Sequence, residues 1–185
     1  NVFGRDREVV SEAYPGDIIG FVTNTQFKVG DTISEDPKVV FERIPCFAPE
    51  CFAYISNITA SIYKSFRKGL EHLIAEDIVQ TFTLKNSNST VPLLGAVGPL
   101  QFEVLQYRLK DEYGAETRLE SMPWVAMRWL EKNMDEDVLE KIIPHGGSWG
   151  YDSQNRQVMF FETAWSLKHF QGTKPEVILL DSLTE

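Results

Sequence analysis

Two groups of residues have types and spacings that could support acid–base or nucleophilic chemistry. His72 and Glu76 are four residues apart in a helical pattern, a spacing that can place a general base beside an orienting carboxylate. The charged residues around them are typical of a solvated helix face, which favours a surface histidine. His145, Ser148 and Asp152 are the residue types of a catalytic triad. No strand-to-helix elbow of the Gly-x-Ser-x-Gly type places Ser148, so we expect no catalytic residue in either group.

The sequence contains one fragment of a nucleotide-binding motif and no metal-binding pattern. Residues 17–20 read Asp-Ile-Ile-Gly, which matches the Asp-x-x-Gly of GTPases but lies in an apolar strand pattern. There is no Gly-x-x-x-x-Gly-Lys-Ser/Thr loop to hold phosphates and no Asn-Lys-x-Asp to recognise guanine. Cys46, Cys51 and the histidines do not have zinc-site spacing, and the acidic residues of 131–140 lack the spacing of a calcium loop. We therefore expect no cofactor and no metal in this chain.

Basic side chains are candidates for contact with a partner rather than for catalysis. Lys64, Arg67 and Lys68 share one predicted helix, and Arg108 and Lys110 share another. If both helices cover one face of a sheet, the two clusters could approach each other and form a local positive surface. The alternative is ordinary solvent-exposed charge that pairs with neighbouring acids, at about 0.2–0.5 kcal/mol per pair.

Two similar units position these basic residues. Residues 51–58 read as a strand, and Ser61 or Ser65 can cap a helix whose Phe66, Leu70 and Leu73 share one face. Residues 78–84 form a second predicted strand and residues 91–97 a third, after a polar loop.

The second predicted helix begins after Gly98, because Pro99 suits a first helical turn. Phe102, Leu105 and Leu109 recur at helical spacing, and Gly114 fits a left-handed cap before an extended segment at 115–122. Together the two units predict β-α-β-β-α-β, the ferredoxin-like split arrangement, over residues 51–122.

The flanking regions predict further structure. Strand patterns at 8–13, 17–23 and 38–42 alternate with Gly-containing turns, as in a small antiparallel barrel, but they are too few to close one. Residues 44–50 contain two prolines and read as a stiff linker. After Pro123 we expect extended residues 125–130, a helix capped by Asp135, a loop at 145–150, a strand at 157–163, helical turns at 165–170 and a last strand at 177–180. These would form a second small α+β layer, with Trp124, Trp129 and Trp149 in its core.

Composition limits the class of protein. The 185 residues allow one or two domains, and a hydrophobic fraction of 43% is enough for a core. No apolar run approaches the ~20 residues of a membrane span. The formal net charge of −9 argues against a freestanding nucleic-acid binder and against sequence-specific DNA binding. It leaves room for docking through a small basic patch.

The residues of the second unit also carry a family resemblance. Residues 95–102 (Gly-Ala-Val-Gly-Pro-Leu-Gln-Phe) with residues 108–113 resemble the C-terminal region of bacterial peptide chain release factor 3. Residues 12–20 with 29–32, and residues 44–50, are similar to it in the same order and spacing. Elongation factor G, a related translational GTPase, has Glu-Leu-His where this chain has Pro-Leu-Gln at 99–101. The resemblance weakens after about Glu131.

The resemblance implies a domain organisation. Residues 1–43 would be the C-terminal half of a translation-factor β-barrel, similar to domain II of these factors, and residues 44–50 a linker. Residues 51–185 would be the C-terminal α+β domain, made of the 51–122 core and an extension at 123–185. The expected fold class is thus α+β: a partial antiparallel β-barrel, a ferredoxin-like α/β sandwich and a further small α+β layer.

The resemblance also implies a function. The chain would be the C-terminal ribosome-contacting region of a cytoplasmic GTPase that promotes dissociation of class 1 release factors in translation termination. GTP and Mg would bind a G domain that precedes Asn1 and works with this region in cis, and the five basic residues Lys64, Arg67, Lys68, Arg108 and Lys110 would be candidate ribosome contacts. One alternative is the C-terminal binding module of an elongation-factor-G-like GTPase. Another is a small α+β enzyme, although no nucleophile, base or metal cluster converges in the sequence.

Overall fold

The structure is a computed structural model that describes residues 9–20, 22–24, 30–42, 45–85, 87 and 91–183. Its regular elements begin at residue 46 and alternate strands with helices. The strands are β1 (Cys46–Phe47), β2 (Cys51–Asn57), β3 (Gln80–Leu84), β4 (Leu93–Ala96), β5 (Thr117–Ser121), β6 (Ala126–Leu130), β7 (Ser148–Asp152), β8 (Gln157–Phe161), β9 (Leu179–Leu180) and β10 (Ser182–Leu183). The α-helices are α1 (Tyr63–Ala75), α2 (Pro99–Tyr113), α3 (Glu136–Ile142) and α4 (Ala164–Thr173), and a 3-10 turn (Ala60–Ile62) precedes α1.

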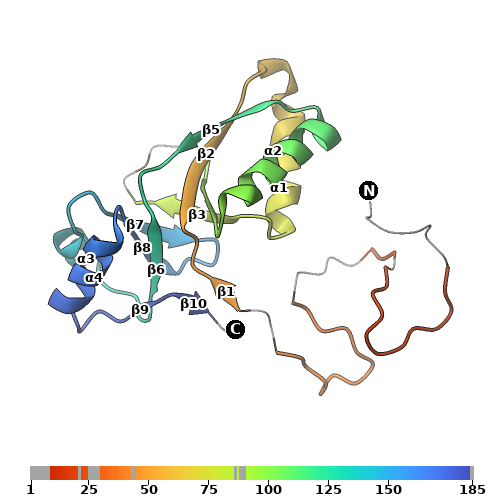
Figure 1. Ribbon diagram of the computed structural model, residues 1–185, viewed down its shortest axis with the longest axis horizontal. Helices are drawn as coiled ribbons and strands as arrows, with labels where there is room; N and C mark the ends of the chain where they lie inside the picture. Colours follow the sequence, from red (N-terminus) through yellow and green to blue (C-terminus); the bar gives the residue numbers. More distant parts are fainter. Residues whose placement is uncertain are drawn as a thin grey trace.

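The predicted ferredoxin-like unit is confirmed. Strands β2, β3, β4 and β5 lie in the order β5-β2-β4-β3 and pair antiparallel, which is the order that two split β-α-β units produce. Helices α1 and α2 cover one face of these four strands (Figure 1). The core between helices and strands contains Phe66, Leu70 and Leu73 of α1, and Phe102, Leu105 and Leu109 of α2.

The second small layer is also confirmed, and it continues the same sheet. Strand β7 pairs with β3, so that β7-β8-β6-β9 extend the first four strands into one open sheet of eight. Helices α3 and α4 cover the second half of the sheet (Figure 1). The fold class is therefore α+β.

The two halves of the sheet face each other across a shared core. Side chains alternate along a strand, so Ala53 points toward α1 and α2 while its neighbour Phe52 points to the opposite face. On that face Phe52 and Phe82 of the first half contact Phe160 of the second. The layer order is thus helices, half-sheet, half-sheet, helices. Trp124 and Trp129 are buried in this shared core, and Trp149 is buried in the cluster under α3 and α4. The prediction that these three tryptophans are core residues is confirmed.

The start of α2 shows how local sequence fixes an element. Pro99 occupies the first helical position. The backbone N–H groups of Val97 and Gly98 both donate to Gln101 Oε1, at 2.7 and 3.3 Å, and Gln101 Nε2 donates to the Ile78 carbonyl at 3.0 Å. At the other end Gly114 adopts φ 66°, the left-handed conformation that glycine tolerates. The predicted caps of α2 are correct.

The predicted cap of α1 is wrong. Its N-cap is Ile62, which makes no side-chain cap hydrogen bond, and neither Ser61 nor Ser65 takes that position. The 3-10 turn directly before α1 explains the difference, because its residues already hold turn geometry where a capping serine would need an extended backbone. The predicted loop at 145–150 is also partly wrong, since β7 begins at Ser148. Residues 148–150 become extended because they pair with β8, and Gly150 also pairs with β3.

The strands predicted at 8–13, 17–23 and 38–42 do not form in the described residues 9–20, 22–24 and 30–42. A strand needs a hydrogen-bonded neighbour, and this segment has none within the described part of the chain. Val9, Ile18 and Val22 are correspondingly fully exposed. The assignment of residues 1–43 to a barrel domain stays a prediction.

The proline-rich segment after it is held in place. Strand β1 pairs antiparallel with β10, so this segment lies beside the end of the chain. Ala48 donates its N–H to the Asp181 carbonyl at 2.8 Å, and Gln80 Nε2 donates to the Phe47 carbonyl at 2.8 Å. Ala48 is buried. Ala48 and Pro49 are therefore docked against the sheet, whereas Phe47 stays 55% exposed, and the boundaries of a 44–50 linker stay a prediction.

Candidate functional site

The five predicted contact residues lie on α1 and α2, which run side by side on one outer face of the molecule (Figure 1). The helices approach closely because α1 has a glycine at the crossing. A Cβ on Gly69 would lie 2.6 Å from Cγ of Tyr113, closer than any ordinary contact. The condition that both helices cover one face of the sheet is met. Whether the two basic clusters join depends on their ion pairs.

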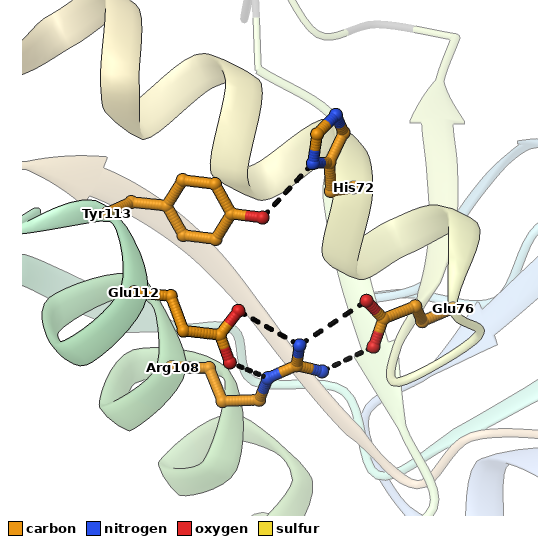
Figure 2. Close-up of polar contacts among 5 residues, drawn as sticks. All are labelled: His72, Glu76, Arg108, Glu112 and Tyr113. Atoms are coloured by element: carbon orange, nitrogen blue, oxygen red, sulfur yellow. Dashed lines mark hydrogen bonds and ion pairs between the residues drawn. The ribbon is translucent and has the colours of Figure 1, made fainter. Parts of the chain in front are cut away.

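Arg108 forms ion pairs with two carboxylates of the same chain, Glu76 and Glu112. Figure 2 shows its guanidinium between Glu76, at the C-terminal end of α1, and Glu112, one turn along α2. Arg108 Nη2 lies 3.0 Å from Glu112 Oε2 and 3.3 Å from Glu76 Oε1, while Nη1 donates to Glu76 Oε2 and Nε to Glu112 Oε1. The hydrogen bonds to Glu112 and then to Glu76 raise the pKa of Arg108. A phosphate would have to displace both carboxylates, so Arg108 joins the two helices and is a poor contact residue.

The other four basic residues differ in whether they form an ion pair with a carboxylate of the chain. Lys110 Nζ is 2.9 Å from Glu116 Oε1, and Arg67 Nε is 3.0 Å from Glu71 Oε1. Lys64 and Lys68 are exposed and form no ion pair within the described part of the chain. The Arg67 pair is exposed on both sides, so it contributes only about 0.3–0.5 kcal/mol and is easily exchanged. Lys64, Arg67 and Lys68 therefore remain as one positive surface on α1, called the α1 basic patch below.

The structure does not bring the two predicted basic clusters together. Arg108 contacts the C-terminal end of α1 at Glu76, whereas the α1 basic patch lies two to three turns earlier along the same helix. Lys110 points to Glu116, beyond the end of α2.

His72 does not form the acid–base pair that its spacing allowed. Its Nδ1 lies 3.1 Å from the Tyr113 hydroxyl, and Figure 2 shows the ring directed to α2. The Glu76 carboxylate that could have oriented it is engaged by Arg108. His72 is exposed, as the surface interpretation requires. Its role is a second polar bridge between α1 and α2.

The triad-like residues are separated by strand geometry. Ser148 and Asp152 are the two ends of β7, so their Cα atoms are about 13 Å apart. Asp152 Oδ2 accepts hydrogen bonds from Arg156 Nε at 2.7 Å and Trp129 Nε1 at 3.0 Å. Asp152 thus closes the turn between β7 and β8. His145 lies on the exposed turn before β7, and no nucleophile–base pair results.

The acidic run supplies a helix start and one cross-element contact. Asp135 Oδ1 accepts the N–H of Asp137 at 2.9 Å, which is the predicted cap of α3. Glu136 forms an ion pair with Lys85 and accepts a hydrogen bond from the Tyr151 hydroxyl at 2.5 Å. The Lys85 hydrogen bond and then that of Tyr151 lower the pKa of Glu136. Within the described residues, no group of three or more His, Cys, Asp or Glu could hold a metal ion.

Two further features of the described residues bear on function. None of the helices combines the length and apolar character needed to cross a bilayer. Sequence reasoning also missed an exposed aromatic pair on α4, Trp165 and His169. Their i, i+4 spacing beside the buried Leu167 and Phe170 is the signal that could have found them.

The ion pairs of Arg108 with Glu76 and Glu112 predict a pH-dependent contribution to the stability of the folded chain. The hydrogen bond from Arg108 is the main cause of the lowered pKa of Glu112. A carboxyl group whose pKa is lower in the folded chain stabilises folding above its unfolded pKa of about 4.3, and this contribution is lost as the pH falls through the folded value. We expect Glu112→Gln to lower the urea midpoint at about pH 7 and to have little effect below the lowered pKa of Glu112, measured across a pH series.

Glu103→Gln is the matched control, because Glu103 is exposed on the same helix and has no ion pair within the described residues. Its small effect should not change with pH. A difference between Glu112→Gln and the unsubstituted chain that persists at acid pH would contradict the prediction.

Known proteins resemble this chain over nearly its whole length. A family described as class II release factor RF3, C-terminal domain, matches residues 41–171. The chain is 43% identical over 179 residues to the protein named peptide chain release factor 3 of Synechococcus elongatus, and 41% identical over 184 residues to that of Acaryochloris marina. Each alignment covers 96% of this chain, but only 32% of the first relative and 33% of the second. The chain thus spans about a third of the length of the curated relatives it matches.

Proposed function

The chain belongs to the class II release factor RF3 family, and on that basis we propose that it is the ribosome-contacting C-terminal region of a peptide chain release factor 3. The observation that carries the proposal is the family match over residues 41–171, which includes the whole ferredoxin-like unit and the α1 basic patch. The named relatives place the family in protein biosynthesis as release factors.

The proposed role of this region is mechanical. The complete factor would bind GTP and Mg in a G domain outside this chain and would promote dissociation of class 1 release factors from the ribosome in the cytoplasm. The sequence has no phosphate-binding loop, which supports placing the site for these groups outside this chain. We propose that this region transmits the nucleotide state of the G domain, in cis, to a contact on the ribosome.

The α1 basic patch is the proposed contact. Of the five candidate residues, Lys64 and Lys68 have no ion pair within the described residues, and Arg67 has only an exposed one. Residues 64, 67 and 68 are spaced i, i+3 and i+4, so they share one helix face that can meet a phosphate backbone or an acidic surface. Arg108 and Lys110 are left out of the proposal, since both are engaged with carboxylates.

Charge reversal tests the patch. We expect Arg67→Glu with Lys68→Glu, made in the complete factor, to weaken co-sedimentation with ribosomes and to reduce the slope of log affinity against log salt by about 2. Both side chains are exposed, so folding should be unaffected.

Lys132→Glu with Lys141→Glu is the matched control. It makes the same change in net charge at two exposed lysines, one in the last turn of α3 and one just before that helix, at the other half of the sheet. Equal affinities for the two double variants would reject the α1 basic patch as the contact, and the family assignment would stand.

A further inference from the structure

Helix α4 exposes a stacked aromatic pair. The rings of Trp165 and His169 are parallel to within 6°, with centroids 4.8 Å apart. Trp165 is 71% exposed, whereas the other three of the four tryptophans in the sequence are at most 8% exposed. A large aromatic ring in water is unfavourable by itself, so an exposed and ordered one is informative about binding.

The position of the pair is held by the helix. Thr163 Oγ1 accepts the N–H of Ser166 at 3.0 Å and Ser166 Oγ caps the Thr163 N–H at 3.3 Å, which orders the first turn that carries Trp165. Leu167 and Phe170 hold the other side of α4 on the sheet. Because His169 covers one face of the indole, the exposed area is its opposite face and its edges.

The exposed neighbours of the pair on α4 are polar rather than apolar. Lys168 directly precedes His169 and lies one turn after Trp165; it is exposed and forms no ion pair within the described residues. At Gly172, one turn beyond Lys168, an added Cβ would meet nothing within 4 Å, so the surface there is open. A protein-binding hot spot needs a ring of apolar contacts that excludes water, and the exposed side of α4 has no aliphatic side chain larger than alanine.

We propose that Trp165 and His169 form a stacking platform for an unpaired base of single-stranded RNA, with Lys168 close to the neighbouring phosphate. Aromatic rings accept any base by stacking, and lysines beside them follow the backbone. The chain's net charge of −9 means that stacking, rather than overall electrostatic attraction, supplies most of the affinity. The site lies on the opposite helical layer from the α1 basic patch, so it goes beyond the proposed function and does not depend on it.

The test uses the 185-residue chain and a dye-labelled oligoadenylate, about eight nucleotides long to cover one site. We expect the oligonucleotide to quench tryptophan emission, because Trp165 is the exposed indole, and to bind the unsubstituted chain at least about fivefold more tightly than Trp165→Ala. Trp165→Phe keeps a stacking face and should retain part of the affinity. A blunt RNA duplex has no unpaired base and should bind equally weakly to all variants.

Tyr107→Ala is the matched control, because it removes an aromatic ring of similar exposure (67%) from α2 and should leave binding unchanged. The proposal is overturned if the oligoadenylate does not bind, if Trp165→Ala binds it as tightly as the unsubstituted chain, or if the duplex binds as well as the single strand. A Trp165→Ala factor that loses ribosome affinity while the chain ignores oligoadenylate would also overturn it, in favour of a protein contact. Failure of Arg67→Glu with Lys68→Glu to affect ribosome binding concerns only the α1 basic patch.

Discussion

Gly150→Ala is expected to lower the free energy of unfolding by about 3 kcal/mol or more, because it inserts a methyl group where two backbones touch. A Cβ on Gly150 would lie 2.2 Å from the Thr83 carbonyl oxygen and 2.9 Å from Leu84 Cα. Both atoms belong to the backbone of β3, so no side-chain rotation can relieve the clash. The strands themselves would have to separate.

The position makes the cost larger than at an ordinary strand glycine. Leu84 and Gly150 are register partners in the β3–β7 pair, which is the one pairing that joins the two halves of the eight-stranded sheet. Gly150 also pairs with Val158 of β8. A movement of β7 away from β3 would therefore disturb the β7–β8 pairing as well. Urea unfolding of the 185-residue chain, followed by circular dichroism, measures the effect.

Gly172→Ala is the matched control with the opposite sign. Gly172 lies in α4, where an added Cβ would meet nothing within 4 Å, so alanine should stabilise the chain by up to about 1 kcal/mol through helix propensity and reduced unfolded-state entropy. Equal unfolding midpoints for Gly150→Ala and the unsubstituted chain would show that the β3–β7 contact is looser than the structure has it.

Phe160→Ala is expected to cost about 3–5 kcal/mol, the usual range for emptying a fully buried phenylalanine site. Phe160 is 0% exposed, and its ring centroid lies 5.0 Å from that of Trp124, 5.2 Å from Phe52 and 5.5 Å from Phe82. Phe52 and Phe82 belong to the first half of the sheet, Phe160 belongs to the second, and Trp124 lies between β5 and β6. The core they form therefore couples the ferredoxin-like unit to the second layer.

The form of the unfolding curve is part of the prediction. If this shared core couples the halves, the unsubstituted chain and Phe160→Ala should each show one transition that is the same by tryptophan fluorescence and by circular dichroism. Tyr107→Ala removes a mostly exposed ring and should stay within about 0.5 kcal/mol of the unsubstituted chain. Two transitions, of which Phe160→Ala moves only one, would contradict the coupling.

Features that depend on neighbours in sequence could be predicted from the sequence. The predicted start of α2 at Pro99 and its C-terminal cap at Gly114 are correct, because a helix end is decided by the backbone preferences of a few adjacent residues. The apolar period that buries Phe102, Leu105 and Leu109 is equally local. Repeated in two units, these signals were enough for the ferredoxin-like arrangement.

Features that depend on distant partners could not be predicted. Residues 148–150 are predicted as a loop, but they become a strand by pairing with β8 and, at Gly150, with β3, more than sixty residues earlier in the chain. The strand patterns before residue 43 show the converse, because apolar alternation without a neighbouring strand in the described residues produces no strand. In both cases the decision is made by hydrogen bonds across the sheet.

The candidate site also has some features that are local in the sequence and others that depend on tertiary packing. Sequence alone determined which basic residues exist and on which helices they lie, because helical spacing is local. The tertiary structure decided which of them remain available: the approach of α1 to α2 at Gly69 brings Glu76 to Arg108, thirty-two residues away, and leaves Lys64 and Lys68 without an ion pair in the described residues. An ion pair between two helices depends on their packing, and no one-dimensional pattern contains that distance.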